Sequence, residues 1–265
     1  MKIIAVANQK GGVGKTTTAV NVSACLAEKG VKTLVVDSDP QGNTTSGLGI
    51  DKAAVSEHSL YDVLINKVDI KNAIIHTKWD NLDICPSHIQ LSGAEIELVS
   101  VEDREFQLKK ALAGVASRYD FAVIDCPPSL GIITLNALAA ADTVLIPIQC
   151  EYYALEGLSQ LMSTIKNVRR SINPSLEIEG ALLTMFDSRT NLSMEVVEEV
   201  KKALPKKVCS TIIPRNVRLS EAPSFGEPIV VYDKNSRGAM CYRALAEELL
   251  DNYKNNNLIR GEANG

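Results

Sequence analysis

Short apolar runs alternate with longer segments of helical periodicity along most of this chain. The runs are rich in Val and Ile and show no alternation with polar residues, which is typical of strands buried on both faces of a parallel sheet. The runs that predict strands are residues 2–7, 33–37, 82–85, 121–125, 143–148, 179–185 and 208–213.

The segments between these runs place apolar residues three and four positions apart, as amphipathic helices do. They cover residues 15–29, 91–117, 132–140, 155–170, 193–204 and 238–253. Strands that alternate with helices predict an α/β fold, a doubly wound, mostly parallel sheet with helices on both faces. Ligands of such sheets bind beyond the carboxyl ends of the strands, so the residues that follow each run are the candidates for function.

Composition narrows the class of protein further. The chain has 265 residues with 45% apolar content and no linker-like segment, so we expect one domain over residues 1–254 and a polar, flexible tail over 255–265. No apolar run approaches the roughly 20 residues that span a bilayer, which predicts a cytoplasmic protein without a membrane partner. Six scattered cysteines without a CxxC pair indicate reduced, buried thiols rather than a metal site.

A glycine-rich loop follows the first predicted strand, where residues 8–17 read NQKGGVGKTT and lead into a helix. In this context glycine amides converge on a phosphate and the helix N-terminus adds partial positive charge. We assign Lys15 to the β- and γ-phosphates and Thr16 to Mg²⁺. Gln9 departs from the general pattern, which has glycine there, and Lys10 opens the glycine run. The predicted nucleotide contacts are Lys10, Gly11, Gly12, Val13, Gly14, Lys15, Thr16 and Thr17.

Two further predicted strands end in acidic residues. Residues 35–41 read VVDSDPQ, and we assign Asp39 to the positioning of an attacking water, because an ordinary carboxylate is a weak base at neutral pH. A turn or capping role before Pro40 is the alternative. The run 121–125 ends at Asp125, which we expect to face Mg²⁺ or its water shell, with a capping role as the alternative.

The stretches KGGVGKTT, DSDPQGN and FAVIDCPPSLG together resemble the ParA/Soj family of chromosome- and plasmid-partitioning ATPases, in the deviant Walker A class of P-loop NTPases that includes MinD. The resemblance extends to TMFDSRTNLS and IIPRNVRLSEAPSFGEPI, nearly the whole chain. It implies a Mg²⁺-dependent ATPase whose ATP-bound sandwich homodimer binds DNA without sequence preference. It also implies that a ParB/Spo0J-like partner stimulates hydrolysis and so releases the DNA.

The same resemblance implies roles for individual residues. Lys10 would reach across the dimer to the partner's nucleotide, with service to its own phosphate site as the alternative. Pro214 and Asn216 would border the adenine, and Arg189 and Arg218 match positions on the DNA-facing surface of the dimer.

Residues 201–218 form a basic stretch, KKALPKKVCSTIIPRNVR, with no acidic residue in a chain of net charge -4. Such asymmetry is typical of a surface that contacts the phosphate backbone, which carries no base information. Aromatic content is only 5%, so we predict non-specific double-stranded DNA binding and a nucleoid-associated protein. A solvated helix end is the alternative for the four lysines. The candidates are Lys201, Lys202, Lys206, Lys207, Arg215 and Arg218.

Other functions remain as alternatives. A MinD-like membrane-associated regulator needs a C-terminal amphipathic helix, whereas NYKNNNLIRGEANG has few bulky apolar residues. An iron protein of the nitrogenase-reductase type needs two suitably placed cysteines. An amide ligase on this fold needs a substrate site that the sequence does not reveal. For the segment 91–117 we expect an amphipathic surface helix, with partner contact as the alternative.

Overall fold

The structure, a computed structural model, describes residues 1–55, 57–152 and 154–262. Its centre is a seven-stranded sheet in the order β3-β4-β2-β5-β1-β6-β7. The pairs β2–β4, β2–β5, β1–β5, β1–β6 and β6–β7 are parallel, and β3–β4 is antiparallel. The strands are β1 Lys2–Val6, β2 Thr33–Asp37, β3 Ile75–His76, β4 Leu82–Cys85, β5 Phe121–Asp125, β6 Thr143–Gln149 and β7 Glu177–Thr184.

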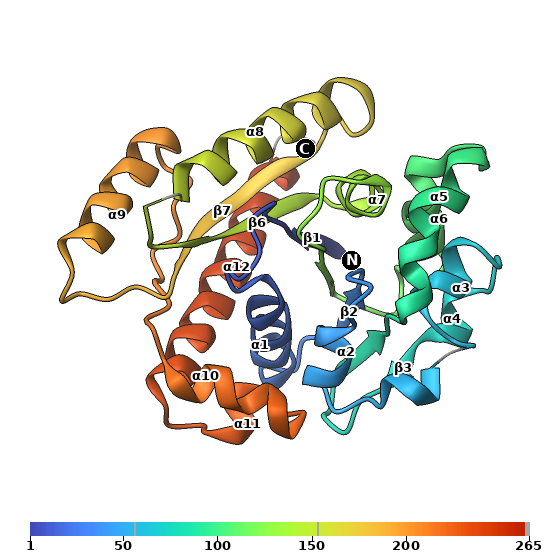
Figure 1. Cartoon of the computed structure of the whole chain (residues 1–265), viewed down its shortest axis with the longest axis horizontal. Coiled ribbons are helices and arrows are strands. Elements are labelled where there is room, and N and C mark those ends of the chain that lie inside the picture. The colour runs from blue at the N-terminus through green and yellow to red at the C-terminus, as the bar shows by residue number, and fades with distance from the viewer. Residues whose placement is uncertain (56, 153, 263–265) are drawn as a thin grey trace.

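Helices cover both faces of the sheet, with α1 and α12 on one side and α7 and α8 on the other (Figure 1). This confirms the predicted doubly wound α/β class. The α-helices are α1 Lys15–Glu28, α2 Asn43–Gly47, α3 Leu60–Leu64, α4 Ile70–Ala73, α5 Ala94–Glu97, α6 Gln107–Ala113, α7 Ile132–Ala140, α8 Ala154–Ser171, α9 Asn191–Ala203, α10 Val217–Glu221, α11 Ile229–Tyr232 and α12 Arg237–Glu262.

Successive residues of β5 face opposite sides of the sheet. Ala122 and Ile124 belong to the core that includes α7 and α8, whereas Phe121 and Val123 pack into the core of α1 and α12, where Tyr242 is buried. Burial on both faces requires apolar residues at every position, which is why the strands have no polar alternation. The register then brings Val6 and Asp37 level with Asp125, so β1, β2 and β5 end at one edge.

The strand predicted at residues 208–213 is absent from the sheet. In the described part of the chain this segment contacts β7 through one isolated bridge, Ala181 with Val208, and a second bridge joins Phe186 with Pro214, just beyond both segments. The seventh strand is instead β3, two residues at the antiparallel edge. Two residues are too few to leave a pattern in a sequence.

The helix predicted at residues 91–117 is broken into shorter pieces. Val101 is extended, with ψ 132°, and Asp103 is left-handed, with φ 51°, so the helix hydrogen bonds cannot continue through them. The pieces are α5 and α6 with the 3₁₀ turns η2 Ile89–Gly93, η3 Leu98–Ser100 and η4 Arg104–Phe106.

The last helix is longer than its sequence pattern predicts. α12 continues to Glu262, past the predicted end at residue 253, so residues 255–262 of the expected tail are helical, and residues 263–265 lie outside the described residues. A polar composition does not stop a helix, which needs proline or a capping residue to end. Within the described chain, no helix has the length and apolarity that crossing a bilayer requires.

Candidate nucleotide-binding site

The glycine loop links the end of β1 to the start of α1. Gly12 and Gly14 have φ 74° and 88°, in the left-handed region that other residues avoid, and Gly14 is the N-cap of α1. The ammonium of Lys15 donates to the carbonyl of Lys10 at 2.9 Å, so the side chain folds back over the loop. Burial lowers the pKa of Lys15, and the nearby Asp125 carboxylate opposes that shift. An anion at this loop would find both a helix N-terminus and a partly desolvated ammonium group.

Asp125 lies at the end of β5 and is completely buried. Its Oδ2 accepts hydrogen bonds from the hydroxyls of Thr16 at 2.8 Å and Thr44 at 2.7 Å, whereas its buried Oδ1 has no hydrogen-bond partner among the described residues. A buried carboxylate oxygen without a donor is costly unless a cation or water reaches it. Hydroxyl and carboxylate oxygens are ligands that Mg²⁺ prefers, so Thr16 and Asp125 fit that ion.

Asp37 is equally buried and lies beside Asp125 across the β2–β5 register. It accepts two hydrogen bonds of 2.7 Å from the amide and hydroxyl of Thr45, and one of 3.2 Å from the amide of Asp39. Burial, together with the neighbouring Asp125 carboxylate, raises the pKa of Asp37, and the hydrogen bonds from Thr45 oppose that rise. Asp37 therefore fixes the loop that carries Asp39 and Thr44.

Asp39 is 8% exposed, and its surroundings bear on the two roles that the sequence leaves open. Its Oδ1 accepts a hydrogen bond from the amide of Gln41 at 2.9 Å, which is a turn contact. Asp39 also lines a cavity of about 340 Å³, together with Pro127 and Pro128 of the loop that follows Asp125. The structure shows the turn role and leaves the carboxylate beside open space.

Lys10 forms an ion pair with Glu151, which follows β6. The loop is tied to the same strand by Asn8, whose side-chain oxygen accepts from the amide of Lys10 at 3.0 Å and whose side-chain nitrogen donates to the carbonyl of Pro147 at 2.7 Å. Neither Glu151 nor Asn8 stands out in the sequence. A charge partner 141 residues away leaves no local signal.

A second cavity, of about 360 Å³, opens beside the glycine loop. Pro214 and Asn216, the predicted adenine contacts, both line it together with Gly14 and Thr17 of the loop. Its wall also includes Tyr242, which the sequence did not single out. A mostly apolar cavity with a few polar groups, next to a phosphate-binding loop, has the character of a site for a nucleoside base.

The predicted DNA-binding residues fall into two groups. The ammonium of Lys207 donates to the carbonyl of Ile178 at 2.9 Å, near the start of β7. The amide of Arg215 donates to the carbonyl of Phe186 at 3.1 Å, just beyond the end of β7. The eight residues of β7 span about 26 Å, so the two groups lie at opposite ends of that strand. We call Arg189, Arg215 and Arg218 the arginine group and Lys201, Lys202, Lys206 and Lys207 the lysine group.

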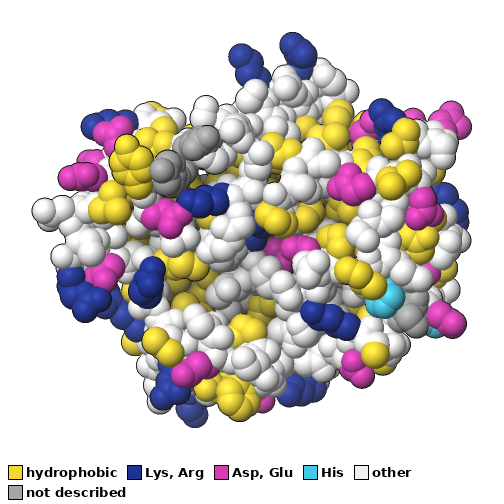
Figure 2. Space-filling view, in the orientation of Figure 1, with side chains coloured by type: hydrophobic (Ala, Val, Ile, Leu, Met, Phe, Trp, Pro, Cys, Tyr) yellow, Lys and Arg dark blue, Asp and Glu magenta, His cyan; other side chains and the backbone are white. Residues whose placement is uncertain are grey.

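Acidic residues outside the basic stretch compensate part of its charge. In the lysine group, Lys201 and Lys202 pair with glutamates one helical turn earlier in α9. In the arginine group, Arg189 pairs with Asp187 and Arg218 pairs with Glu221. Figure 2 likewise shows Lys and Arg side chains on this face in small groups, several of them beside Asp and Glu. The positive charge of this stretch, which has no acidic residue in the sequence, is therefore partly neutralised in the folded chain.

Together the loop, the Thr16–Asp125 pair and the sheet define a nucleotide-binding P-loop protein of the deviant Walker A type. Comparison with known proteins agrees, since a family model described as an AAA domain matches residues 1–178. The chain is 60% identical over 251 residues to the sporulation initiation inhibitor protein Soj of Bacillus subtilis, covering 95% of this chain and 99% of that protein. It is 55% identical over 249 residues to the chromosome partitioning protein ParA of Myxococcus xanthus, covering 94% and 88%. The chain therefore belongs to the Soj/ParA family of chromosome-partitioning ATPases.

One solved structure extends the comparison to the fold. It is a cobyrinic acid a,c-diamide synthase from Mycobacterium smegmatis with bound ATP analog and magnesium, 40% identical to this chain. The match covers 96% of each chain with a TM-score of 0.85.

Proposed function

We propose that this protein is an ATP-hydrolysing DNA-partitioning switch. In this scheme an ATP-bound sandwich homodimer binds double-stranded DNA without sequence preference, and hydrolysis stimulated by a ParB/Spo0J-like partner releases it. The observation that carries the proposal is that the cavity beside the glycine loop adjoins predicted DNA-binding arginines. Arg215 and Asn216 line the cavity beside the glycine loop. The side-chain oxygen of Asn216 accepts a hydrogen bond from the amide of Arg218 at 2.8 Å. The nucleotide cavity and the arginine group thus share one short segment.

ATP and Mg²⁺ are the cofactors of the proposed reaction. Lys15 and the loop amides would cradle the phosphates, and Thr16 and Asp125 would hold Mg²⁺, with the buried Oδ1 of Asp125 as the free ligand. When bound, the ion neutralises charge that develops on the transferred phosphoryl group. The crystal structure of the 40% identical relative, with ATP analog and magnesium bound, supports this assignment.

Asp39 is proposed to orient the attacking water. Its carboxylate lies on a cavity wall, held at one oxygen by the amide of Gln41. Phosphoryl transfer passes through a loose transition state in which little proton abstraction is needed early, so orientation matters more than basicity. The other carboxylate oxygen is the group that would hold the water.

Lys10 is proposed to act on the nucleotide of the second copy in the dimer. A cation supplied in trans makes catalysis conditional on assembly. In the single chain Lys10 pairs with Glu151, so this role requires the Lys10 side chain to exchange that carboxylate for a phosphate. A triphosphate carries more negative charge than the Glu151 carboxylate, which favours this exchange.

Dimerisation would couple ATP to DNA by doubling the footprint. Two weak phosphate-binding surfaces on one face bind far more tightly than one, without any new contact. The arginine group at the nucleotide edge is proposed as the main surface, and the lysine group as a second, weaker one. Non-specific binding of this kind would place the ATP-bound protein on the nucleoid.

A second candidate function is an ATP-dependent amide ligase, favoured by the name of the 40% identical solved structure. A ligase consumes ATP only with a carboxylate acceptor and a nitrogen donor, whereas the proposed switch turns over ATP with water alone. ATP hydrolysis measured without any acceptor, with and without DNA, separates the two. Turnover that depends on an acceptor would favour the ligase.

The test of the proposed function compares one sample without nucleotide, with ADP and with ATP. Size-exclusion chromatography and DNA binding are measured at two salt concentrations. We expect a dimer and salt-sensitive DNA binding with ATP only, because each neutralised phosphate contributes about -0.9 to the log–log salt slope. Equal DNA affinity of the nucleotide-free monomer would contradict the proposal.

A further inference from the structure

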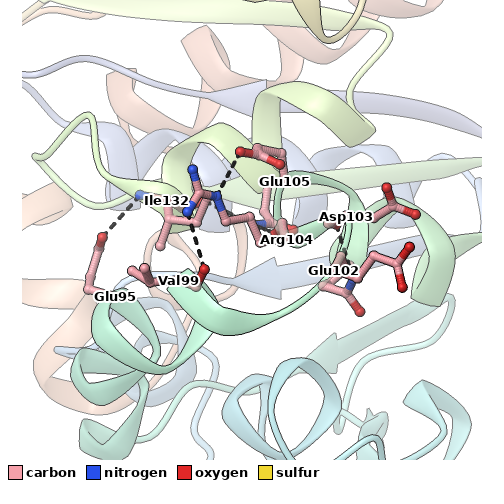
Figure 3. Close-up of polar contacts among 9 residues, drawn as sticks. Glu95, Val99, Glu102, Asp103, Arg104, Glu105 and Ile132 are labelled. Carbon is pink, nitrogen blue, oxygen red and sulfur yellow. Dashed lines mark hydrogen bonds and ion pairs between the residues drawn. The ribbon is translucent and has the colours of Figure 1, made fainter.

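A carboxylate from a distant segment caps the helix that follows the Asp125 loop. Glu95 of α5 accepts a hydrogen bond at 3.0 Å from the amide of Ile132, the first residue of α7 (Figure 3). The first amides of a helix have no partner within the helix, and a carboxylate is favoured there by the partial positive charge. Glu95 is half-buried and is separated from Ile132 by 37 residues.

The loop between Asp125 and α7 is held at both ends. At its start the amide of Cys126 donates to the carbonyl of Val6 at 3.2 Å, which ties it to β1. At its end Glu95 holds Ile132, and the hydroxyl of Thr134 donates to the carbonyl of Ser129 at 2.7 Å. The orientation of residues 126–131 therefore depends in part on the contact between Glu95 of α5 and Ile132.

This loop and Glu95 border the cavity that contains Asp39. Pro127, Pro128 and Ser129 of the loop line this cavity together with Asp39 and Glu95. A shift of the loop would change the shape of this cavity and the direction of the Asp125 carboxylate at its start. Glu95 is thus in a position to control the side of the site where water would attack.

Residues that follow Glu95 in the chain are hydrogen-bonded to α7. The buried side chain of Asn136 in α7 donates to the carbonyl of Arg104 at 2.7 Å and accepts from the amide of Leu108 at 3.1 Å. The guanidinium of Arg104 in turn donates to the carbonyl of Val99 at 3.3 Å (Figure 3). α7 is therefore joined to residues 104–108 through Asn136, independently of Glu95, which holds only the first residue of α7.

We propose that Glu95 is a positioning residue for ATP hydrolysis, which holds the loop 126–131 in the orientation that the Asp39 and Asp125 carboxylates require. Glu95 touches neither phosphate nor metal in this proposal and acts through the first turn of α7. The inference rests on the proposed ATPase function. We expect its effect on kcat rather than on ATP binding, because the phosphates are assigned to Lys15 and the glycine loop and not to residues 126–131.

The first test compares Glu95→Ala, Glu95→Gln and the matched control Glu102→Ala in steady-state ATP hydrolysis with DNA present. Glu95→Ala should lower kcat about tenfold and leave KM for ATP within about twofold, because small displacements of catalytic groups reduce the rate more than the binding. Glu95→Gln should restore most of kcat, since its amide oxygen still accepts from Ile132. Glu102→Ala removes one exposed charge from the same segment and should leave kcat unchanged.

A second variant breaks the same contact from the other side. A methyl group at Gly131 would clash with both carboxylate oxygens of Glu95. Gly131 has φ -76°, which alanine adopts freely, so Gly131→Ala displaces the carboxylate without straining the backbone. We expect Gly131→Ala to lower kcat as much as Glu95→Ala does. The double variant should lose no more kcat than either single variant, because all three disrupt the same contact.

The outcomes separate this inference from the proposed function. Wild-type protein without ATP turnover overturns both. Normal wild-type turnover with unchanged kcat in Glu95→Ala overturns only the role of Glu95. A rise in KM equal to the fall in kcat, or an additive loss in the double variant, also overturns it, because such results indicate general damage to the site.

Discussion

Lys15 and Asp39 are both buried at the same edge of the sheet, yet their surroundings suit different tasks. The ammonium of Lys15 donates to the carbonyl of Lys10, which folds the side chain over the glycine loop, and burial lowers the pKa of Lys15. A phosphate is a stronger hydrogen-bond partner for an ammonium group than a carbonyl and would replace it. Asp39 keeps one oxygen on Gln41 and lies on a cavity wall. Binding and catalysis should therefore be separable by mutation.

Lys15→Ala should abolish nucleotide binding. The variant removes the only side-chain cation that we assign to the phosphates within one chain, so affinity for a fluorescent ATP analogue should fall at least about 100-fold, as expected for a desolvated charged contact. Lys29→Ala, which loses an exposed pair with Glu247 at the end of α1, is the control. Binding by the Lys15 variant at wild-type affinity would show that the loop amides suffice.

Asp39→Ala should retain ATP binding and lose hydrolysis by about 100-fold, which leaves the dimer on DNA. Asp39→Asn keeps an oxygen for the amide of Gln41 and removes only the charge. If Asp39 orients water, Asn should be nearly as inactive as Ala. Full activity of Asn would mean that the turn contact is the whole role of this residue, and Asp80→Ala, an exposed carboxylate, serves as the control.

At the scale of elements, two neighbouring parallel strands end in aspartates at the same level. The register pairs Asp37 of β2 with Asp125 of β5, so two carboxylates are buried side by side. Burial raises the pKa of each, and their mutual repulsion adds to the rise at Asp37. Strand ends of a parallel sheet meet at one edge, which makes this pair a consequence of topology rather than of local sequence.

This pair predicts the pH dependence of stability without metal. The pKa of Asp125 in the folded chain is raised from 3.8 to about 6. At low pH the buried carboxyl is neutral and does not destabilise the fold. The free energy of unfolding therefore falls as the pH rises through this pKa. Asp125→Asn never ionises and keeps an oxygen for Thr16 and Thr44. We expect it to be more stable than wild type by about 1–3 kcal/mol at pH 8 and by much less at pH 4, since one pKa unit corresponds to about 1.4 kcal/mol.

Chemical unfolding at pH 4 and pH 8, with chelator and then with Mg²⁺-nucleotide, measures this effect. Mg²⁺-nucleotide should stabilise the wild type at pH 8 more than it stabilises Asp125→Asn, which lacks the charged ligand of the ion. A stability gain of the variant that is equal at both pH values would contradict the ionisation of Asp125 as its cause.

At the scale of the whole molecule, the fold divides one basic stretch between two places. Residues 201–218 run alongside β7, with the lysine group near its start and Arg215 beyond its end, where Arg215 lines the cavity beside the glycine loop. Of the two groups, the arginine group is the one with a residue, Arg215, in the lining of that cavity. Nucleotide-dependent DNA binding should therefore depend more on the arginine group than on the lysine group.

Charge reversal tests this division. Arg218→Glu should weaken DNA binding of the ATP-bound form at least about tenfold and reduce the log–log salt slope by about 0.9 for each DNA phosphate that the variant no longer neutralises. ATP affinity should remain unchanged. Lys202→Glu, an equal change of charge in the lysine group, should have a smaller effect, and the reverse order would locate the DNA surface at the other end of β7.

Sequence patterns predicted β2, β4 and β5 with correct bounds because strands buried on both faces need apolar residues at every position. The glycine loop was predictable because a left-handed turn before a helix requires glycine at Gly12 and Gly14. The pattern failed where the reason for a conformation is not local. The bridge of Val208 to β7 depends on a neighbour outside its own segment, whereas the predicted helix breaks at the left-handed Asp103 without a signal in the pattern.

By itself the sequence determined the α/β class, the phosphate loop and the acidic strand ends, because these depend on contacts within a few residues. Tertiary structure alone decided which distant groups meet. It placed Glu151 on Lys10, Thr44 on Asp125 and Glu95 on the first turn of α7. Such partners are set by the order of strands in the sheet, and a side chain that contacts a residue dozens of positions away leaves no periodic signal around itself.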